Sequence, residues 1–160
     1  AGGGALPVKY YDRSHNEELQ PHRDIMEDKL IKHCIGEGIP IIATCRGMQY
    51  LNVLFGGKLL YHPTLESDRP RGVDHKVYLV EENREIWVNN FHQDVVPADG
   101  LAPCFKPLAI DRENNTIEAF GSDEMKILAL QWHPERKFAT ANALEDTRRL
   151  VINFIQRHIK

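Results

Sequence analysis

The stretch IPIIATCRGMQYLNVLFGG, residues 39–57, is the part of the sequence that best indicates the fold class. Its first part, residues 39–44, is a short apolar run rich in β-branched side chains, which predicts a buried parallel strand. The residues after Cys45 place apolar side chains at helical spacing, and a pair of glycines ends that helix. Cys45 is therefore expected at a strand-to-helix turn.

Other helices and strands are expected on both sides of this segment. Helical spacing from Met26 to Ile35 follows Pro21 and Asp24, and a last helix is expected from about Thr140 to Ile159. Residues 126–132 predict a second central strand, and the remaining expected strands are shorter and peripheral: 76–80, 86–88, 105–110 and 116–120. Alternating strands and helices indicate an α/β sheet with helices on both sides.

Composition favours a single domain over residues 1–160 and excludes several function classes. The net charge of -3 and the pI near 6.3 do not fit a nucleic-acid-binding surface. No apolar run reaches the roughly 20 residues that span a bilayer, so no membrane partner is expected. Three cysteines without paired spacing argue against a disulfide framework and a structural zinc site, and they fit the reducing cytoplasm.

Cys45 is the candidate nucleophile. A cysteine attacks as the thiolate, and the amides of a helix N-terminus favour that form. The same turn offers the backbone N–H of Arg46 to a developing oxyanion, and one such donor is worth roughly a hundredfold in rate. The alternative interpretation is a small buried hydrophobe, which we assign to Cys34 and Cys104.

His133 and Glu135 are the candidate base and its orienting carboxylate. His133 follows the second central strand at its carboxyl end, where open α/β sheets place their sites. Residues two apart in an extended segment point the same way, so Glu135 can hold the imidazole in one tautomer. A His-Pro-Glu string alone is common, and its combination with Cys45 favours the catalytic interpretation.

Four segments in order resemble the class I glutamine amidotransferase-like hydrolases, in particular the γ-glutamyl-γ-aminobutyrate hydrolase family. They are PIIATCRGMQYLNVLFGG at 40–57, QWHPE at 131–135, the glycines at 2–4 with Pro7 and Tyr10, and VNNFHQ at 88–93, which is similar to a VNS-x-HHQ segment. The resemblance implies a flavodoxin-like fold: an open, mostly parallel sheet flanked by helices, with a small antiparallel element.

The resemblance also implies a covalent γ-glutamyl thioester that water releases, with no metal or organic cofactor. It assigns Cys45, His133 and Glu135 to a catalytic triad, Arg46, Gly3 and Gly4 to the oxyanion hole, and Gln49, Asn90, Phe91 and His92 to the substrate side. Gln93 and Asp94 replace the usual second His and Gln of the family, which leaves the leaving amine open. The family has strands and a helix before the glycine run, so we expect an N-terminally incomplete domain.

Three functions remain open. The first is a hydrolase that releases glutamate and an amine from small γ-glutamyl amides. The second is a glutaminase subunit that supplies ammonia to a synthase, and the third is a catalytically silent binding or regulatory module. Residues 69–72 with His75 could meet a substrate carboxylate, but they are interpreted as a solvated surface loop. The histidines at 15, 22, 33, 62 and 158 lack ligand-like spacing, and a homodimer is left open.

Overall fold

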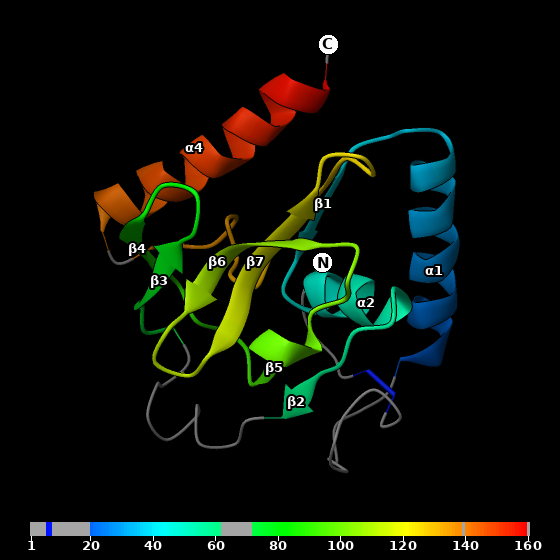
Figure 1. Cartoon of the computed structure of the whole chain (residues 1–160), viewed down its shortest axis with the longest axis horizontal. Helices are drawn as coiled ribbons and strands as arrows, with labels where there is room; N and C mark the ends of the chain where they lie inside the picture. Colours follow the sequence, from blue (N-terminus) through cyan, green and yellow to red (C-terminus); the bar gives the residue numbers. More distant parts are fainter. Residues whose placement is uncertain (1–5, 8–19, 62–71, 139, 160) are drawn as a thin grey trace.

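The structure is a computed structural model that describes residues 6–7, 20–61, 72–138 and 140–159 (Figure 1). Helices are found where the sequence predicts them, and the sheet holds more strands than expected. In chain order the elements are α1 (Pro21–Gly36), β1 (Ile41–Thr44), α2 (Arg46–Leu54), β2 (Leu60–Tyr61), β3 (His75–Leu79), β4 (Arg84–Val88), β5 (Asp94–Pro97), the 3-10 helix η2 (Ala98–Gly100), β6 (Lys106–Asp111), β7 (Thr116–Ser122), β8 (Ile127–Leu130) and α4 (Ala141–His158).

The α/β class is confirmed, but strand pairing in the described residues is mostly antiparallel rather than mostly parallel. The strand order is β1-β8-β7-β6-β3-β4, and β5 pairs with both β7 and β2. Among the described strands, β1 and β8 are the one parallel pair. Short turns join β3 to β4, β6 to β7 and β7 to β8, and such connections produce antiparallel pairs. The strands expected at the periphery therefore belong to the main sheet.

Hairpin turns explain this difference at the level of single residues. Asn83 and Asn115 adopt φ values of 53° and 55° at the ends of the β3–β4 and β6–β7 turns. Asparagine tolerates this left-handed conformation better than most residues. These turns fold the middle of the chain back on itself, and they do so without glycine, which is the strongest sequence signal for a hairpin.

Hydrophobic cores lie on both faces of the sheet. Along β8, Ile127 and Ala129 belong to a core with α2, while Leu128 and Leu130 belong to a core with Phe154 of α4. Successive side chains of a strand point to opposite faces, so a four-residue apolar strand serves both cores. Figure 1 accordingly shows the strands between α4 on one side and α1 and α2 on the other.

The strand β1 is less buried than the sequence predicts. Ile42 is 40% exposed, because β1 pairs with β8 alone among the described strands. Ile31 and Ile35 of α1 pack against the core beside β1.

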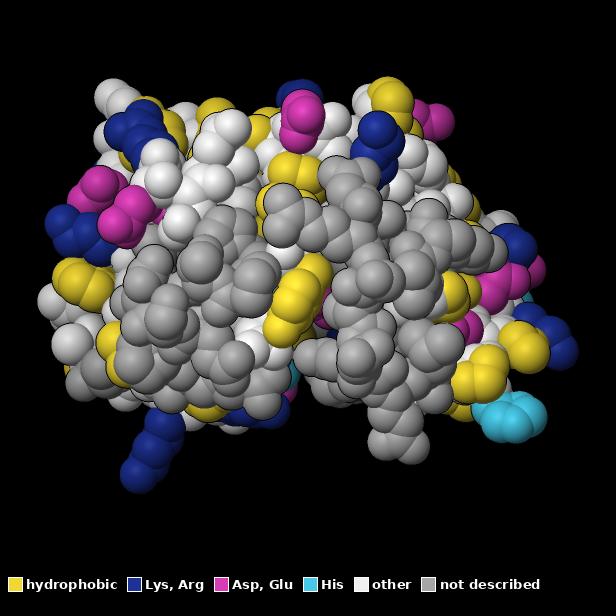
Figure 2. Space-filling view, turned by 90° about the horizontal axis from the view of Figure 1, so that it is seen from below, with side chains coloured by type: hydrophobic (Ala, Val, Ile, Leu, Met, Phe, Trp, Pro, Cys, Tyr) yellow, Lys and Arg dark blue, Asp and Glu magenta, His cyan; other side chains and the backbone are white. Residues whose placement is uncertain are grey.

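In the described part of the chain, no helix combines the length and apolarity needed to cross a bilayer. On the face seen in Figure 2, described acidic and basic side chains are interspersed rather than gathered by sign.

Candidate active site

Cys45 lies in a sharp turn between β1 and α2, as its sequence context predicts. Its backbone adopts φ 51° and ψ -115°, a conformation that is uncommon for a residue with a side chain. The turn is held from both sides: Cys45 N donates to Leu130 O at 2.8 Å, and Gln49 N donates to Cys45 O at 3.1 Å. Backbone strain of this kind, fixed by its surroundings, is typical of functional sites and of nucleophile elbows.

His133 and Glu135 form a hydrogen-bonded pair. The distance between His133 Nδ1 and Glu135 Oε1 is 2.6 Å, with the imidazole buried and the carboxylate 57% exposed. Burial by itself would raise the pKa of Glu135, but the hydrogen bond with His133, a backbone hydrogen bond and nearby positive charge together bring that pKa below its ordinary value. With Nδ1–H donating to the carboxylate, Nε2 is the nitrogen that can accept a proton.

The nucleophile candidate and the base candidate follow neighbouring strands. In the parallel pair β1 and β8, Thr44 is opposite Leu130, so Cys45 and His133 come just after the carboxyl ends of the two strands. Sites in open α/β sheets form at such ends. The register therefore brings residues 88 positions apart in sequence to the same rim of the sheet.

Comparison with known proteins identifies the family of this chain. Residues 1–135 match the sequence profile of the Peptidase C26 family. The chain belongs to the Peptidase C26 family. This family assignment confirms the resemblance to class I glutamine amidotransferase-like proteins.

Members and structural neighbours of the family are longer than this chain. The glutamine amidotransferase-like protein YvdE of Lactococcus lactis is 31% identical over 158 residues, which cover 87% of this chain and 65% of the relative. The γ-glutamyl-γ-aminobutyrate hydrolase PuuD of Escherichia coli K12 is 26% identical over 151 residues, covering 81% and 59%. A glutamine amidotransferase structure from Thermotoga maritima has a TM-score of 0.58 at 17% identity, covering 85% and 54%, and shows the shared fold. The chain thus spans less than two thirds of the length of these proteins.

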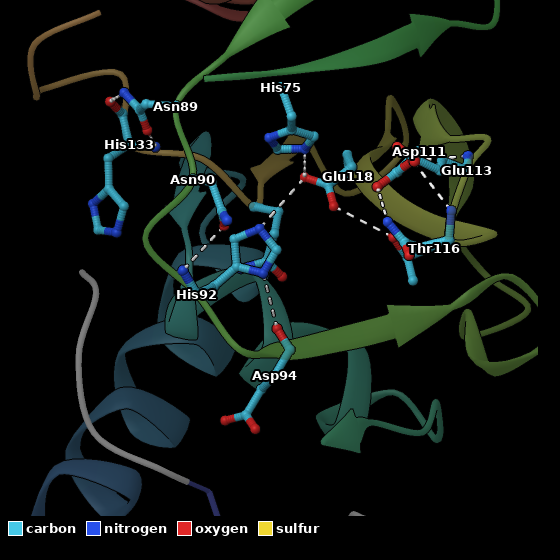
Figure 3. Close-up of polar contacts among 12 residues, drawn as sticks. His75, Asn89, Asn90, His92, Asp94, Asp111, Glu113, Thr116, Glu118 and His133 are labelled. Carbon is cyan, nitrogen blue, oxygen red and sulfur yellow. Dashed lines mark hydrogen bonds and ion pairs between the residues drawn. The ribbon is translucent and has the colours of Figure 1, made fainter. Parts of the chain in front are cut away.

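The position of His133 in this Peptidase C26 chain is fixed by Asn89, which the sequence analysis did not single out. His133 N donates to Asn89 Oδ1, and Asn89 Nδ2 donates to His133 O, both at 2.9 Å. Figure 3 shows the two residues side by side. The Phe91 ring lies edge-on to the imidazole with its centroid 5.7 Å away. The signal for Asn89 was its place in the VNNFHQ segment.

Gln49 and Arg46 make structural contacts in addition to the roles predicted for them. Gln49 Nε2 donates to the backbone oxygen of Asp94 at 2.8 Å. The buried Arg46 guanidinium forms ion pairs with Asp24 and Glu27 of α1. These contacts join the start of α2 to α1 and to β5. Gly3 and Gly4 lie outside the described residues.

The predicted substrate-side residues 90–92 do not all face the same way. Phe91 contacts His133, whereas the buried ring of His92 lies near Asp94 and Glu118 (Figure 3). Asn90 Oδ1 accepts from His92 N at 3.4 Å. Burial lowers the pKa of His92, although the Glu118 carboxylate opposes that shift. Phe91 therefore adjoins the His133–Glu135 pair.

The sequence analysis expected His75 to lie in a solvated loop, and the structure shows that it does not. It begins β3 and is 5% exposed, with Nε2 lying 3.6 Å from Glu118 Oε2. Burial alone would raise the pKa of Glu118, but His92 and His75 hold that pKa below its ordinary value. The expectation was wrong because His75 was judged by the charged residues before it rather than by the strand that it starts.

Proposed function

We propose that this chain carries a thiol-dependent hydrolase site for γ-glutamyl amides, with Cys45 as nucleophile, His133 as acid and base, and Glu135 as the orienting carboxylate. The observation that carries the proposal is the 2.6 Å contact between His133 and Glu135, which follow the strand that pairs in parallel with the strand before Cys45. Membership of the Peptidase C26 family supports it, as does the name of the relative PuuD.

In the proposed reaction, the Cys45 thiolate attacks the carbonyl carbon of the γ-glutamyl amide. The resulting oxyanion is stabilised by the Arg46 amide and by a second donor from the glycine run at 2–4. His133 then protonates the departing amine, the C–N bond breaks and a γ-glutamyl thioester remains.

Water completes the reaction. His133 takes a proton from the water molecule, whose oxygen attacks the thioester carbon, and the C–S bond breaks to release glutamate. The thiolate and the protonated imidazole are thereby restored. The sum is one amide and one water converted into glutamate and an amine, so no oxidant or cofactor takes part in the atom balance.

Glutamate release from a panel of γ-glutamyl amides tests this proposal. The panel contains glutamine and γ-glutamyl derivatives of small amines, including γ-aminobutyrate. We expect release by the purified chain, and a loss of at least about 10⁴-fold in kcat for Cys45→Ala. Retained activity in that variant would refute the thiol mechanism. Glutamine turnover that requires an added synthase would instead favour the glutaminase hypothesis.

A labelling experiment separates the nucleophile from the other cysteines. A diazo-ketone analogue of glutamine should add once to the chain, as measured by intact mass, and not to Cys45→Ala. Cys104→Ala is the matched control, because Cys104 is exposed and partial burial raises the pKa of its thiol. An adduct that persists in Cys45→Ala and disappears in Cys104→Ala would contradict the assignment.

A further inference from the structure

A second group of ionisable side chains lies inside the sheet, away from the His133–Glu135 pair. His75 of β3, Asp111 of β6 and Glu118 of β7 come from three adjacent strands. Each offers one ligand atom, and these atoms lie within 4.8 Å of one another. The three side chains are 5%, 2% and 1% exposed. Figure 3 shows Glu118 between His75 and His92.

Several atoms of this cluster have no hydrogen-bond partner among the described residues. They are both ring nitrogens of His75, Nε2 of His92 and Oε2 of Glu118. Buried polar atoms in native proteins are nearly always paired with protein or bound solvent, so such a concentration in one place needs a cause. Two buried carboxylates also concentrate negative charge that the interior must balance.

The spacing of these atoms matches ligands that share an ion. Glu118 Oε2 lies 3.6 Å from His75 Nε2 and 3.8 Å from His92 Nε2. These distances are long for a hydrogen bond. Two ligand atoms bound at about 2.1 Å to a tetrahedral zinc ion lie about 3.4 Å apart. A small closure of the side chains would therefore convert this group into a coordination shell.

We propose that His75, His92, Asp111 and Glu118 bind a divalent transition-metal ion, with zinc as the best fit. Imidazole nitrogen and carboxylate oxygen are a donor set that Zn²⁺ accepts in tetrahedral sites. The imidazoles disfavour Ca²⁺ and Mg²⁺, which prefer shells of oxygen alone. Nothing in the sequence indicates this site, because its ligands come from separate segments instead of one spaced motif.

Surrounding contacts orient the ligands. His92 Nδ1 lies 3.3 Å from Asp94 O, and a hydrogen bond donated there leaves the lone pair of Nε2 facing Glu118. A lone pair facing a carboxylate oxygen repels it unless a cation lies between them. Such hydrogen bonds behind a ligand histidine are usual in metal sites.

The Asp111 carboxylate is held in the same way. Its oxygens accept from the backbone amide of Glu113 at 2.9 Å and from Nδ2 of Asn114 at 2.8 Å. Each oxygen of a carboxylate has two lone pairs, so a carboxylate can accept hydrogen bonds and bind a metal ion at the same time. His75 and Asp111 line a surface cavity of about 540 Å³, which gives an ion a route from solvent.

Zinc titration of the chelator-treated chain tests the proposal without any assay of hydrolysis. The Cys45→Ala background is used, so that a thiolate beside His133 cannot bind the ion. We expect one equivalent of Zn²⁺ in competition with a chromogenic chelator, and a Tm that rises with added Zn²⁺. X-ray absorption should show nitrogen and oxygen ligands at about 2.0–2.2 Å and no sulfur.

Substitutions locate the site. His75→Gln and Glu118→Gln should each weaken zinc binding by about 100-fold or more, because each removes a direct ligand. His33→Gln, on the exposed surface of α1, is the matched control and should bind normally. Asp111→Asn keeps an acceptor oxygen for the turn and serves if His75→Gln does not fold. The absence of stoichiometric binding, a shell containing sulfur, or unchanged affinity in Glu118→Gln and Asp111→Asn would overturn the proposal.

Discussion

Two imidazole–carboxylate groups in this chain have opposite surroundings. Glu135 is 57% exposed and lies 2.6 Å from His133 Nδ1, whereas Glu118 is 1% exposed and lies 3.6 Å from His75 Nε2. The first carboxylate is paired by a residue two positions away in sequence. The second depends on strands that are distant in sequence and is left with an atom that bonds to no described residue. The difference fits the two proposals, in which the first group moves a proton and the second holds a cation.

The largest effect is expected from removing the imidazole of the His133–Glu135 pair, the open pair, whose carboxylate is exposed. His133→Gln should lower kcat by about 10⁴-fold or more, because one ring serves both as acid and as base in the proposed cycle. Glutamate release measures the activity, and thermal denaturation shows whether the variant is folded. A folded variant with a kcat within tenfold of the wild type would show that His133 is not the acid and base, and the proposed contrast between the two groups would be wrong.

A smaller loss is expected from changing the carboxylate of the same pair. Glu135→Gln should lower kcat by about 10³-fold, because an amide can donate to Nδ1 and so favour the wrong tautomer. Glu135→Asp keeps the charge and should recover part of the loss. Kinetics of both variants separate charge from shape. Equal kcat values for Glu135→Gln and the wild type would show that the pair does not orient the imidazole.

How well the sequence predicts each group follows from the same comparison. QWHPE places His133 and Glu135 two residues apart, so a local pattern was enough to pair them. The approach of Cys45 to the same rim follows from two apolar strands that both end at candidate residues. Predicting the buried cluster of His75, Asp111 and Glu118 would have required the register of β3, β6 and β7, which no local sequence pattern specifies.

Errors in the predicted fold have a related cause. The family resemblance led to the expectation of a mostly parallel sheet, but six of the seven described strand pairs are antiparallel, and short turns join the strands in three of them. Two of those turns use Asn83 and Asn115 rather than glycine. The strands β2 and β5 were missed because they are only two and four residues long and gain their order by pairing with each other and with β7.

Asn89 links the open pair to the sheet, and its removal should have an intermediate effect. Asn89→Ala deletes two buried 2.9 Å hydrogen bonds to the backbone of His133. We expect a loss of about 2 kcal/mol in the free energy of unfolding and about tenfold in kcat, because the imidazole is no longer held in place. Urea unfolding and glutamate release measure the two quantities. A loss of stability without any change in kcat would show that Asn89 supports the fold alone.

The smallest effect concerns pH, and it distinguishes the exposed carboxylate from a buried one. The pKa of Glu135 is lowered in the folded chain: partial burial raises it, but the hydrogen bond with His133, a backbone hydrogen bond and the charges of His133 and Arg136 together outweigh burial. A carboxyl with a depressed folded-state pKa adds stability that is fully present above its unfolded pKa of about 4.5 and is lost as pH falls through the folded value. The difference in Tm between the wild type and Glu135→Gln should therefore be constant from pH 7 to about pH 5, and it should shrink only in more acidic buffer. It should also be small, since an exposed ion pair is screened by solvent. A difference that fades between pH 7 and pH 5 would mean that Glu135 titrates near neutrality, and the contrast between the open pair and the interior would then be lost.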